Sequence, residues 1–151
     1  MIQKLDTGLQ QSLHQRGRRM TRQRQAVHDA VLAAHDHPSA EDVFQRVRRS
    51  LPDVSLATVY NSLEALVECG QIAKVPRSDE GPARYGHRLD PHHHARCVGC
   101  GKVWDVDEDA FDVRPRNIGI RFRPVAFKVE MLVECPRNCG ECSNKRAAVA
   151  G

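Results

Sequence analysis

The sequence predicts an α+β protein, with helices in the first half of its 151 residues and short strands after them. Three observations lead to this prediction. Apolar residues recur at helical spacing as far as Gly70, alternating segments follow, and histidine and cysteine clusters occupy the last third. No apolar run approaches the roughly 18 residues of a membrane-spanning helix. Residues 1–11 lack a secretory pattern, so we expect a cytoplasmic protein that contacts no membrane.

Each of the four expected helices has a recognisable start or stop. Thr21, Ser39 and Ser55 are expected N-caps, because their hydroxyl oxygens can accept hydrogen bonds from the first backbone amides of a helix. Asp42, three residues after Ser39, nearly completes a capping box. Glycine or proline residues follow the helices and end them. The expected helices are residues 1–16, 22–35, 40–51 and 56–69.

Two alternating segments, residues 71–75 and 83–87, follow the last helix and are joined by a turn-rich connection. Helices followed by a β-hairpin predict a winged helix-turn-helix, whose last helix enters the major groove of double-stranded DNA. A helical module with a protein-binding groove is the alternative. The net charge of +4 and a local arginine cluster favour a phosphate backbone as partner. The expected DNA-contacting residues are Arg22, Arg24, Ser55, Ala57, Thr58, Tyr60 and Asn61.

The composition of the chain changes near Pro91, where polar residues indicate a hinge. We therefore expect a winged-helix domain over residues 1–88, a hinge over 89–93 and a small α/β domain over 94–151.

In this second domain, one expected strand has a wholly apolar face, and a small sheet of this kind is marginal when isolated. The domain is therefore predicted to mediate homodimerisation. Its expected elements are strands 94–98 and 102–106, a short helix 107–113 and the strand 125–134.

Six cysteines in a chain expected to be cytoplasmic indicate metal or redox chemistry and not a disulfide scaffold. The pairs Cys97/Cys100 and Cys139/Cys142 can supply the four ligands of a tetrahedral structural Zn²⁺. Cys135 is a possible substitute in the second pair. A thioredoxin-like redox pair is the alternative, but a strand pattern follows Cys100 where that motif needs a helix. The His-x-Glu signature of a zinc deaminase does not occur in the sequence.

His92 and His94 are two residues apart, so on a strand they face one side, while His93 faces the other. Two imidazoles and a carboxylate suit iron, manganese or zinc. Asp105 lies on the expected neighbouring strand, and His37 is expected to contribute from the first domain, so that one ion holds both domains. The alternative is that the histidine run is an exposed polar loop.

Taken together, several motifs resemble the ferric uptake regulator family of metalloregulators over nearly the whole chain. The motifs are Met20-Thr-Arg-Gln-Arg24, His37-Pro-Ser-Ala-Glu-Asp42, Ser55-Leu-Ala-Thr-Val-Tyr-Asn61, His92-His-His-Ala-Arg-Cys-Val-Gly-Cys100 and the C-terminal cysteines. The resemblance implies a homodimeric repressor, not an enzyme, that binds an AT-rich palindromic operator. It also implies a zinc ion on four cysteines and a regulatory metal on residues that match His37, His92, His94 and Asp105.

Two positions depart from the family pattern. The family's remaining regulatory ligand falls on Gly86, so either His87, one residue away, substitutes for it, or the site has four ligands, or water fills the gap. A histidine that belongs to a further site in the family falls on Phe127. His93 and Glu108 remain but lack that partner, so we expect no independent third site.

Asp105, in place of glutamate, resembles the peroxide-responsive branch of the family. That branch implies a regulatory Fe²⁺ or Mn²⁺ site, where iron(II) and hydrogen peroxide oxidise ligand histidines corresponding to His37 and His92. Loss of a ligand then releases DNA. The alternatives are an iron-responsive regulator, or a zinc-, manganese- or haem-responsive one, without peroxide sensing.

Overall fold

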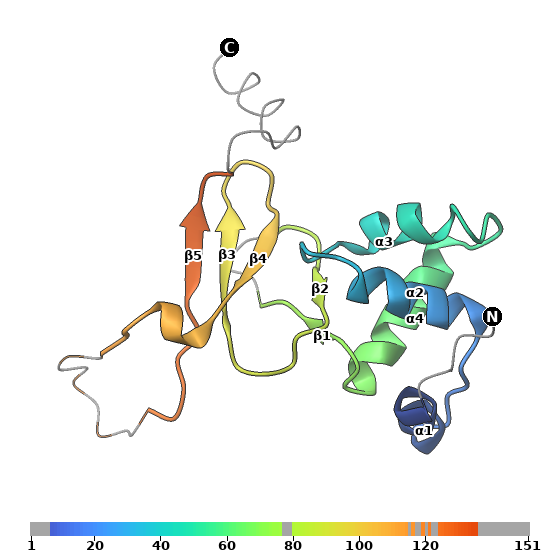
Figure 1. The fold of residues 1–151 in the computed structure, drawn as a ribbon, viewed down its shortest axis with the longest axis horizontal. Coiled ribbons are helices and arrows are strands. Elements are labelled where there is room, and N and C mark those ends of the chain that lie inside the picture. The colour runs from blue at the N-terminus through green and yellow to red at the C-terminus, as the bar shows by residue number, and fades with distance from the viewer. Residues whose placement is uncertain are drawn as a thin grey trace, which may run out of the picture. The chain divides into compact units, whose positions relative to one another are not determined.

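The structure is a computed structural model that describes residues 7–76, 80–114, 116, 119, 121 and 124–135. The chain forms two compact units, which divide between Leu89 and Asp90. Figure 1 shows the helices and short hairpin of the first unit and the larger sheet of the second. Among the described residues, no helix is both long enough and apolar enough to cross a membrane.

The described part of the first unit contains four helices, as the sequence predicts. Each helix turns one apolar stripe inward, because apolar residues recur every three or four positions. The stripes meet in one core, whose fully buried members include Leu13, Val27, Val43 and Leu63. Leu5, expected in the first helix, lies outside the described residues. The helices are α1 (Thr7–Gln15), α2 (Arg22–Leu32), α3 (Ala40–Val47) and α4 (Leu56–Glu68).

Side-chain caps determine where three of these helices begin. Thr21 Oγ1 and Ser55 Oγ each accept a hydrogen bond of 3.1 Å from the backbone amide three residues further on. At α3 the capping box is complete: Ser39 Oγ accepts from the Asp42 amide at 3.2 Å, and the Asp42 carboxylate accepts from the Ser39 amide at 2.9 Å. The three predicted N-caps are confirmed.

Removing the α3 cap is expected to destabilise the first unit. Burial raises the pKa of Asp42, but hydrogen bonds from Ser39 and the charges of Arg84 and Arg46 outweigh it, so the pKa lies below its ordinary value. A lowered carboxyl pKa stabilises the fold at neutral pH, and this contribution is lost as the pH falls through the lowered pKa. We expect Ser39→Ala to lower the free energy of unfolding at pH 7 by about 1 kcal/mol.

Urea unfolding measures this difference, and it should shrink in acid as Asp42 becomes protonated. Ser50→Ala is the matched control, because Ser50 follows α3, is exposed and caps no helix start. Equal losses for the two variants would contradict a stabilising capping box.

A short antiparallel hairpin follows α4. Its strands are β1 (Ala73–Lys74) and β2 (Tyr85–Gly86), with Ala73 opposite Gly86 and Lys74 opposite Tyr85. Tyr85 is buried in the helical core and so anchors the hairpin to the helices. The strands are shorter than expected, but helices followed by a hairpin confirm the winged helix-turn-helix.

The second unit is built on a three-stranded sheet, with β3 (His93–Cys97) between β4 (Val103–Val106) and β5 (Glu130–Val133). β3 pairs antiparallel with β4 and parallel with β5. Because parallel strands end on the same side of a sheet, Cys97 at the end of β3 lies opposite Val133 at the end of β5. With the helical first unit, this sheet confirms the predicted α+β class.

The prediction of a short helix over residues 107–113 is wrong in its length. A single 3-10 turn forms at Glu108–Ala110. Asp107 precedes this turn but makes no side-chain cap hydrogen bond, and no residue of the turn is buried. A helix this short needs a cap or a buried face to persist, because nucleating a helix is costly.

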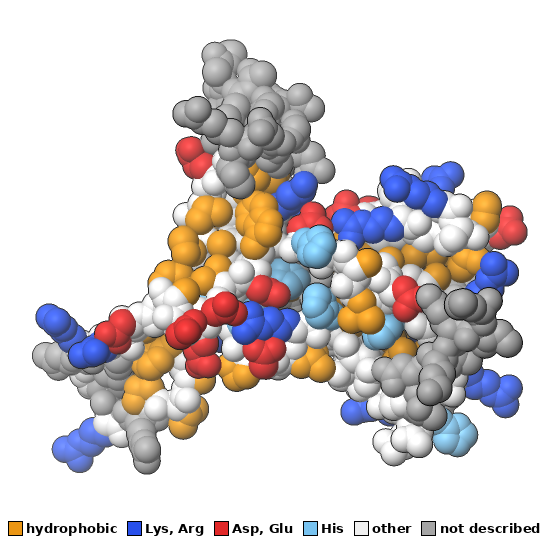
Figure 2. All heavy atoms as spheres, in the orientation of Figure 1, with side chains coloured by type: hydrophobic (Ala, Val, Ile, Leu, Met, Phe, Trp, Pro, Cys, Tyr) orange, Lys and Arg blue, Asp and Glu red, His pale blue; other side chains and the backbone are white. Residues whose placement is uncertain are grey.

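The strand expected over residues 125–134 is also shorter than predicted. In the parallel register, residue 129 lies level with His93, where β3 begins, so residues 125–128 extend past the end of their neighbour. Val125 is 97% exposed and Phe127 is also exposed. Figure 2 shows hydrophobic side chains gathered over the sheet of this unit, which is typical of a surface that is covered in an assembly.

Candidate metal centres

Three cysteines gather where β3 and β5 end. Their Sγ atoms lie within 4.8 Å of one another, and all three residues are buried. Cys97 closes β3, Cys100 lies on the following turn, and Cys135 comes two residues after β5. The parallel pairing of the two strands therefore brings together ligands that are far apart in sequence. Cys100 Sγ and Cys135 Sγ are 3.4 Å apart, which is too far for a disulfide of about 2.05 Å.

Buried thiolates at this spacing suit Zn²⁺, which takes four thiolate or imidazole ligands in a tetrahedron. The described residues supply Cys97, Cys100 and Cys135. Cys135, which the sequence offered as an alternative ligand, therefore lies with the pair Cys97/Cys100. Cys139 and Cys142 lie outside the described residues. After Cys100 the chain turns into β4 and not into a helix, which argues against a thioredoxin-like redox pair.

A second group of potential ligands forms on one side of the β3–β4 pair. Asp105 lies opposite His94 in the strand register, and His92 immediately precedes β3 on the same side. Asp105 Oδ1 is 2.9 Å from His92 Nε2 and 3.6 Å from His94 Nε2. The two imidazole centroids are 4.6 Å apart. Two imidazoles and one carboxylate therefore converge within a single unit.

The backbone orients one of these rings. His92 Nδ1 lies 2.6 Å from the carbonyl oxygen of Asp90. A carbonyl oxygen only accepts hydrogen bonds, so Nδ1 carries a proton, and Nε2 is the ring nitrogen that faces Asp105. Metal-ligating histidines usually have this arrangement, in which a hydrogen bond at one nitrogen fixes the other as the ligand. The donor set thus fits a divalent cation.

His93 points to the opposite side of the strand, as the alternation predicts. Its ring packs against Phe111 at a centroid distance of 5.5 Å, and its Nδ1 accepts a hydrogen bond from the Val129 amide. The residue is buried, while Glu108 and Phe127 are exposed. Packing and backbone pairing thus account for His93 without a metal.

His37 belongs to the first unit, where the hairpin holds it. Its Nδ1 lies 3.3 Å from the Tyr85 carbonyl oxygen, and its own carbonyl accepts a hydrogen bond of 3.0 Å from Arg84. By the same argument as for His92, Nδ1 donates this hydrogen bond to the Tyr85 carbonyl. Gly86 lies beside the ring, and His87 is exposed just after β2.

The residues expected to contact DNA lie on the outer face of α4. Ser55, Ala57, Tyr60 and Asn61 are exposed, and Thr58 is partly buried. Tyr60 donates a hydrogen bond of 2.9 Å to a Glu41 oxygen. This hydrogen bond raises the pKa of Tyr60, so the hydroxyl remains protonated at neutral pH. The face offers small, hydroxyl, amide and aromatic groups that can read base edges and phosphates.

The two arginines at the start of α2 differ in their surroundings. Arg22 is exposed, whereas Arg24 is partly buried and donates to the carbonyl oxygen of Arg19. Arg24 therefore supports the loop before α2, and Arg22 is the arginine presented to solvent.

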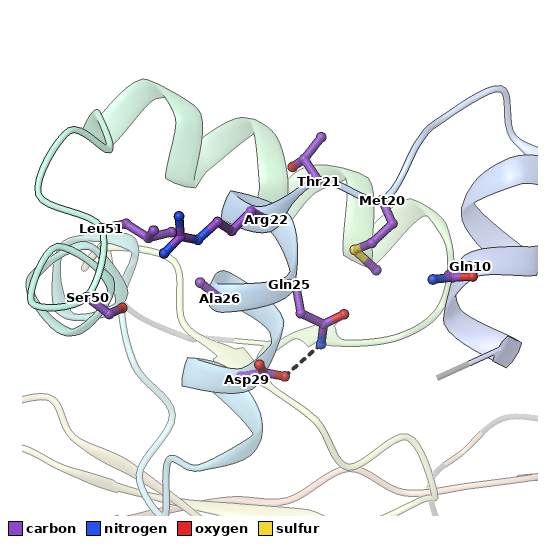
Figure 3. Close-up of a pocket in the computed structure, with 9 residues that line it drawn as sticks. All are labelled: Gln10, Met20, Thr21, Arg22, Gln25, Ala26, Asp29, Ser50 and Leu51. Carbon is purple, nitrogen blue, oxygen red and sulfur yellow. Dashed lines mark hydrogen bonds between the residues drawn. The ribbon is translucent and has the colours of Figure 1, made fainter. Parts of the chain in front are cut away.

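Arg22 also borders an open pocket of about 540 Å³, shown in Figure 3. Gln25 donates to Asp29 at 2.8 Å on its wall. None of the nine residues that line it is a histidine or cysteine, so it offers no typical site for a transition metal. The lining residues are Gln10, Met20, Thr21, Arg22, Gln25, Ala26, Asp29, Ser50 and Leu51.

Sequence reasoning missed several residues that support these sites. Asp90 and Tyr85 act through backbone carbonyls, which carry no signal in the sequence. Trp104 packs against the cysteine cluster. The alternation of side chains along its strand could have indicated that Trp104 faces this cluster. Arg96 donates to Glu130 at 2.9 Å and ties β3 to β5. Opposite charges on two neighbouring expected strands could have indicated that pair.

Comparison with known proteins gives a consistent result. The model of the ferric uptake regulator family matches residues 15–131. A peroxide-responsive repressor PerR of Staphylococcus saprophyticus is 35% identical over 101 residues, which cover 67% of this chain and 68% of that protein. A PerR of Staphylococcus aureus is 34% identical over 94 residues, covering 62% of this chain and 63% of that protein, less than two thirds of its length. The solved ferric uptake regulator of Pseudomonas aeruginosa with manganese has a TM-score of 0.61 at 26% identity, covering 84% of this chain and 97% of that one.

Proposed function

Because the chain belongs to the ferric uptake regulator family of metal-responsive regulators, we propose that it is a DNA-binding transcriptional repressor whose DNA affinity depends on a bound Fe²⁺ or Mn²⁺. We further propose that hydrogen peroxide reverses this binding. The protein would act in the cytoplasm as a homodimer on an AT-rich palindromic operator.

The observation that carries this proposal is the convergence of His92, His94 and Asp105. Two histidines and one carboxylate with open positions are typical of iron(II) sites that react with oxygen species. The hydrogen bond from His92 to Asp90 supports a ligand role, because it leaves Nε2 to face the other donors. When bound, the metal would supply a positive centre that holds these three donors together. If the metal is iron(II), an open position would allow it to react with peroxide.

We propose His37 as a fourth regulatory ligand, through Nε2. In this proposal one ion bridges both units and favours the arrangement in which two winged helices of a dimer fit successive half-sites. The exposed position of His87 gives no support to its role as a substitute ligand.

For the structural Zn²⁺, we propose Cys97, Cys100 and Cys135 as ligands, with Cys139 or Cys142 completing the tetrahedron. The close Sγ atoms of the first three residues support this choice.

For DNA recognition, we propose that the outer face of α4 reads base edges and that Arg22 contacts phosphate. The exposure of Tyr60, Asn61 and Arg22 supports this assignment. Dimerisation through the second unit is supported by the exposed hydrophobic residues of its sheet, such as Leu132.

A metal-responsive regulator without peroxide sensing is the second candidate. The likeness to the ferric uptake regulator of Pseudomonas aeruginosa, solved with manganese at 26% identity, favours it.

Metal-dependent DNA binding tests the proposed function. DNA is first selected from a random pool with the zinc-containing protein and Mn²⁺, and retardation of the selected DNA is then measured with Mn²⁺ or with EDTA. We expect His92→Ala to weaken Mn²⁺-dependent binding by about 5- to 150-fold, the usual range for coupling between two sites.

His14→Ala is the matched control, because His14 is an exposed histidine at the end of α1. Mn²⁺-independent binding by the parent protein would overturn the repressor proposal. Selected sequences that are neither AT-rich nor palindromic would contradict the proposed AT-rich palindromic operator.

A further inference from the structure

We propose that Glu41, in the first turn of α3, is a specificity-determining residue that keeps the Tyr60 hydroxyl from phosphate and so confines Tyr60 to the edges of bases. This inference rests on the proposed function and assigns a role in DNA reading to a residue outside α4. It concerns how the outer face of α4 discriminates against the uniform phosphate backbone while it contacts the base sequence.

A hydrogen bond joins Glu41 on α3 to Tyr60 on α4. The Tyr60 hydroxyl donates to Glu41 Oε1 at 2.9 Å, within the usual range for hydrogen bonds between two oxygens. A phenol has one proton to donate, and the phosphate oxygens of DNA only accept. Tyr60 can therefore donate to a phosphate only after it gives up its hydrogen bond to Glu41.

The location of Glu41 suits this role. Glu41 lies in the first turn of α3, where the free backbone amides of a helix favour negative charge. Asp42, the other acid of this turn, is engaged in the capping box, so Glu41 is the carboxylate that reaches Tyr60. The hydrogen bond raises the pKa of Tyr60, as expected when a phenol donates to an ionised acceptor.

The charge of Glu41 is not balanced in the way that other acids near α4 are. Glu64 lies 2.8 Å from Lys74 Nζ. Glu68 likewise pairs with Arg18 at 2.9 Å. Within the part of the chain that the structure describes, the exposed carboxylate of Glu41 has no basic partner of this kind. A phosphate within a Debye length of about 8 Å would therefore be repelled by this charge.

The ring of Tyr60 remains available to bases. Tyr60 is 39% exposed, and Ala57, one helical turn earlier on the same face, is small and exposed. Asn61, the next residue, is exposed and carries an amide that can pair with a base edge. A ring held by its hydroxyl can contact the methyl group of thymine, which no other DNA base carries in the major groove. The hydrogen bond to Glu41 therefore favours contact with a base over contact with the backbone.

Four variants of the full chain, with zinc and Mn²⁺ bound, separate the position of Tyr60 from the charge of Glu41. Glu41→Gln removes the charge but keeps an acceptor for the Tyr60 hydroxyl, whereas Glu41→Ala removes both. Tyr60→Phe removes the hydroxyl and keeps the charge of Glu41. Asp109→Asn is the matched control for net charge, because Asp109 is an exposed acid of the second unit.

The effect of the charge is measured by retardation of DNA of unrelated sequence. We expect Glu41→Gln and Glu41→Ala to bind this DNA about 2- to 5-fold more tightly than the parent protein, the range for one exposed charge interaction. The gain should be larger at low salt, because salt screens exposed charges. Tyr60→Phe and Asp109→Asn should bind it like the parent protein.

The position of Tyr60 is measured with the selected DNA, in which each thymine is replaced in turn by deoxyuridine, which lacks only the methyl group. For the parent protein, at least one replacement should weaken binding about fourfold, the effect of one buried methyl group. Glu41→Gln should keep this methyl effect, while Glu41→Ala and Tyr60→Phe should both lose most of it. Combining the last two substitutions should cause no further loss, because both remove the same hydrogen bond.

An alkaline titration tests the contact without DNA. The chain contains two tyrosines, and burial together with Glu64 strongly raises the pKa of Tyr85, so Tyr60 should form the first phenolate. Ultraviolet absorbance is expected to show this phenolate at lower pH in Glu41→Gln than in the parent protein, because a neutral acceptor no longer opposes ionisation. The first step should be missing in Tyr60→Phe.

These outcomes separate this inference from the proposed function. If the parent protein binds the selected DNA while the Glu41 variants keep its methyl effect and its affinity for unrelated DNA, the role of Glu41 is wrong and the proposed function stands. The same conclusion follows if the effects of Glu41→Ala and Tyr60→Phe add, or if Glu41→Gln leaves the Tyr60 titration unchanged. If the parent protein with Mn²⁺ binds no DNA, the proposed function fails, and the role of Glu41 in DNA reading fails with it.

Discussion

Replacing Cys97 with serine is expected to abolish zinc binding and to unfold the second unit while the helical first unit stays folded. Cys97 closes the central strand of a small sheet, and its Sγ lies within 4.8 Å of those of Cys100 and Cys135. A three-stranded sheet of this size has little core of its own. Structural zinc sites of small domains contribute folding energy directly, on the order of 10 kcal/mol in zinc-finger peptides. Losing this folding free energy should leave the second unit less stable than its unfolded state.

The chain contains a local probe for this effect. Trp104 is its single tryptophan and packs against the cysteine cluster, so its fluorescence reports on the second unit. The helices of the first unit dominate the far-ultraviolet circular dichroism. For Cys97→Ser we expect zinc content to fall from about one ion per chain to near zero. Tryptophan emission should shift to that of an exposed indole, while most helical signal is retained.

Cys69→Ser is the matched control. Cys69 follows α4 in the first unit and packs against the helical core, away in sequence from the cluster. This variant is expected to keep its zinc and its tryptophan emission. A Cys97→Ser protein that retains zinc and the tryptophan emission of the parent protein would show that the three described cysteines do not hold the ion.

Features specified by nearby residues were predictable from the sequence. The N-caps at Thr21, Ser39 and Ser55 involve atoms three residues apart, so the sequence contains both partners of each hydrogen bond. The same holds for His92 and His94, whose common side follows from strand alternation, with Asp105 brought opposite by a short turn. These local rules account for the four helices, the hairpin and one half of the proposed regulatory site.

Features that depend on distant residues were less predictable. Alternation marked residues 125–128 as strand, but a strand needs a neighbour, and β3 begins only at His93, which lies level with residue 129. The pairing of β5 with β3 was also hidden, so the sequence offered Cys135 only as an alternative zinc ligand and did not place it beside Cys100. The fit between His37 and Gly86 joins residues 49 positions apart and leaves no motif.

Treating the iron(II)-loaded protein with hydrogen peroxide is expected to release DNA and to add about 16 Da to the peptides that carry His37 or His92. One oxygen atom of the peroxide would be added to an imidazole carbon, and the other would leave as water, so the reaction is balanced. The loss of DNA affinity is expected to be large, because an oxidised imidazole is a less basic ligand for the metal. The metal-dependent gain in DNA affinity then disappears. Peptide mass spectrometry and DNA retardation on the same samples measure both effects. The Mn²⁺-loaded protein should show neither.

Asp105→Glu is the discriminating variant. Asp105 has a short side chain, and one of its oxygens, Oδ1, lies 2.9 Å from His92 Nε2 and 3.6 Å from His94 Nε2. The carboxylate therefore approaches both rings through a single oxygen. Glutamate is one methylene longer and can bring both oxygens to a metal, which would fill the position that peroxide needs. We therefore expect this variant to keep Mn²⁺- and Fe²⁺-dependent DNA binding but to lose most of the mass gain. If the parent protein gains no mass, plain metal sensing is the better account. If both proteins gain it equally, the carboxylate length does not control access, and the specificity for peroxide must come from elsewhere around the two histidines.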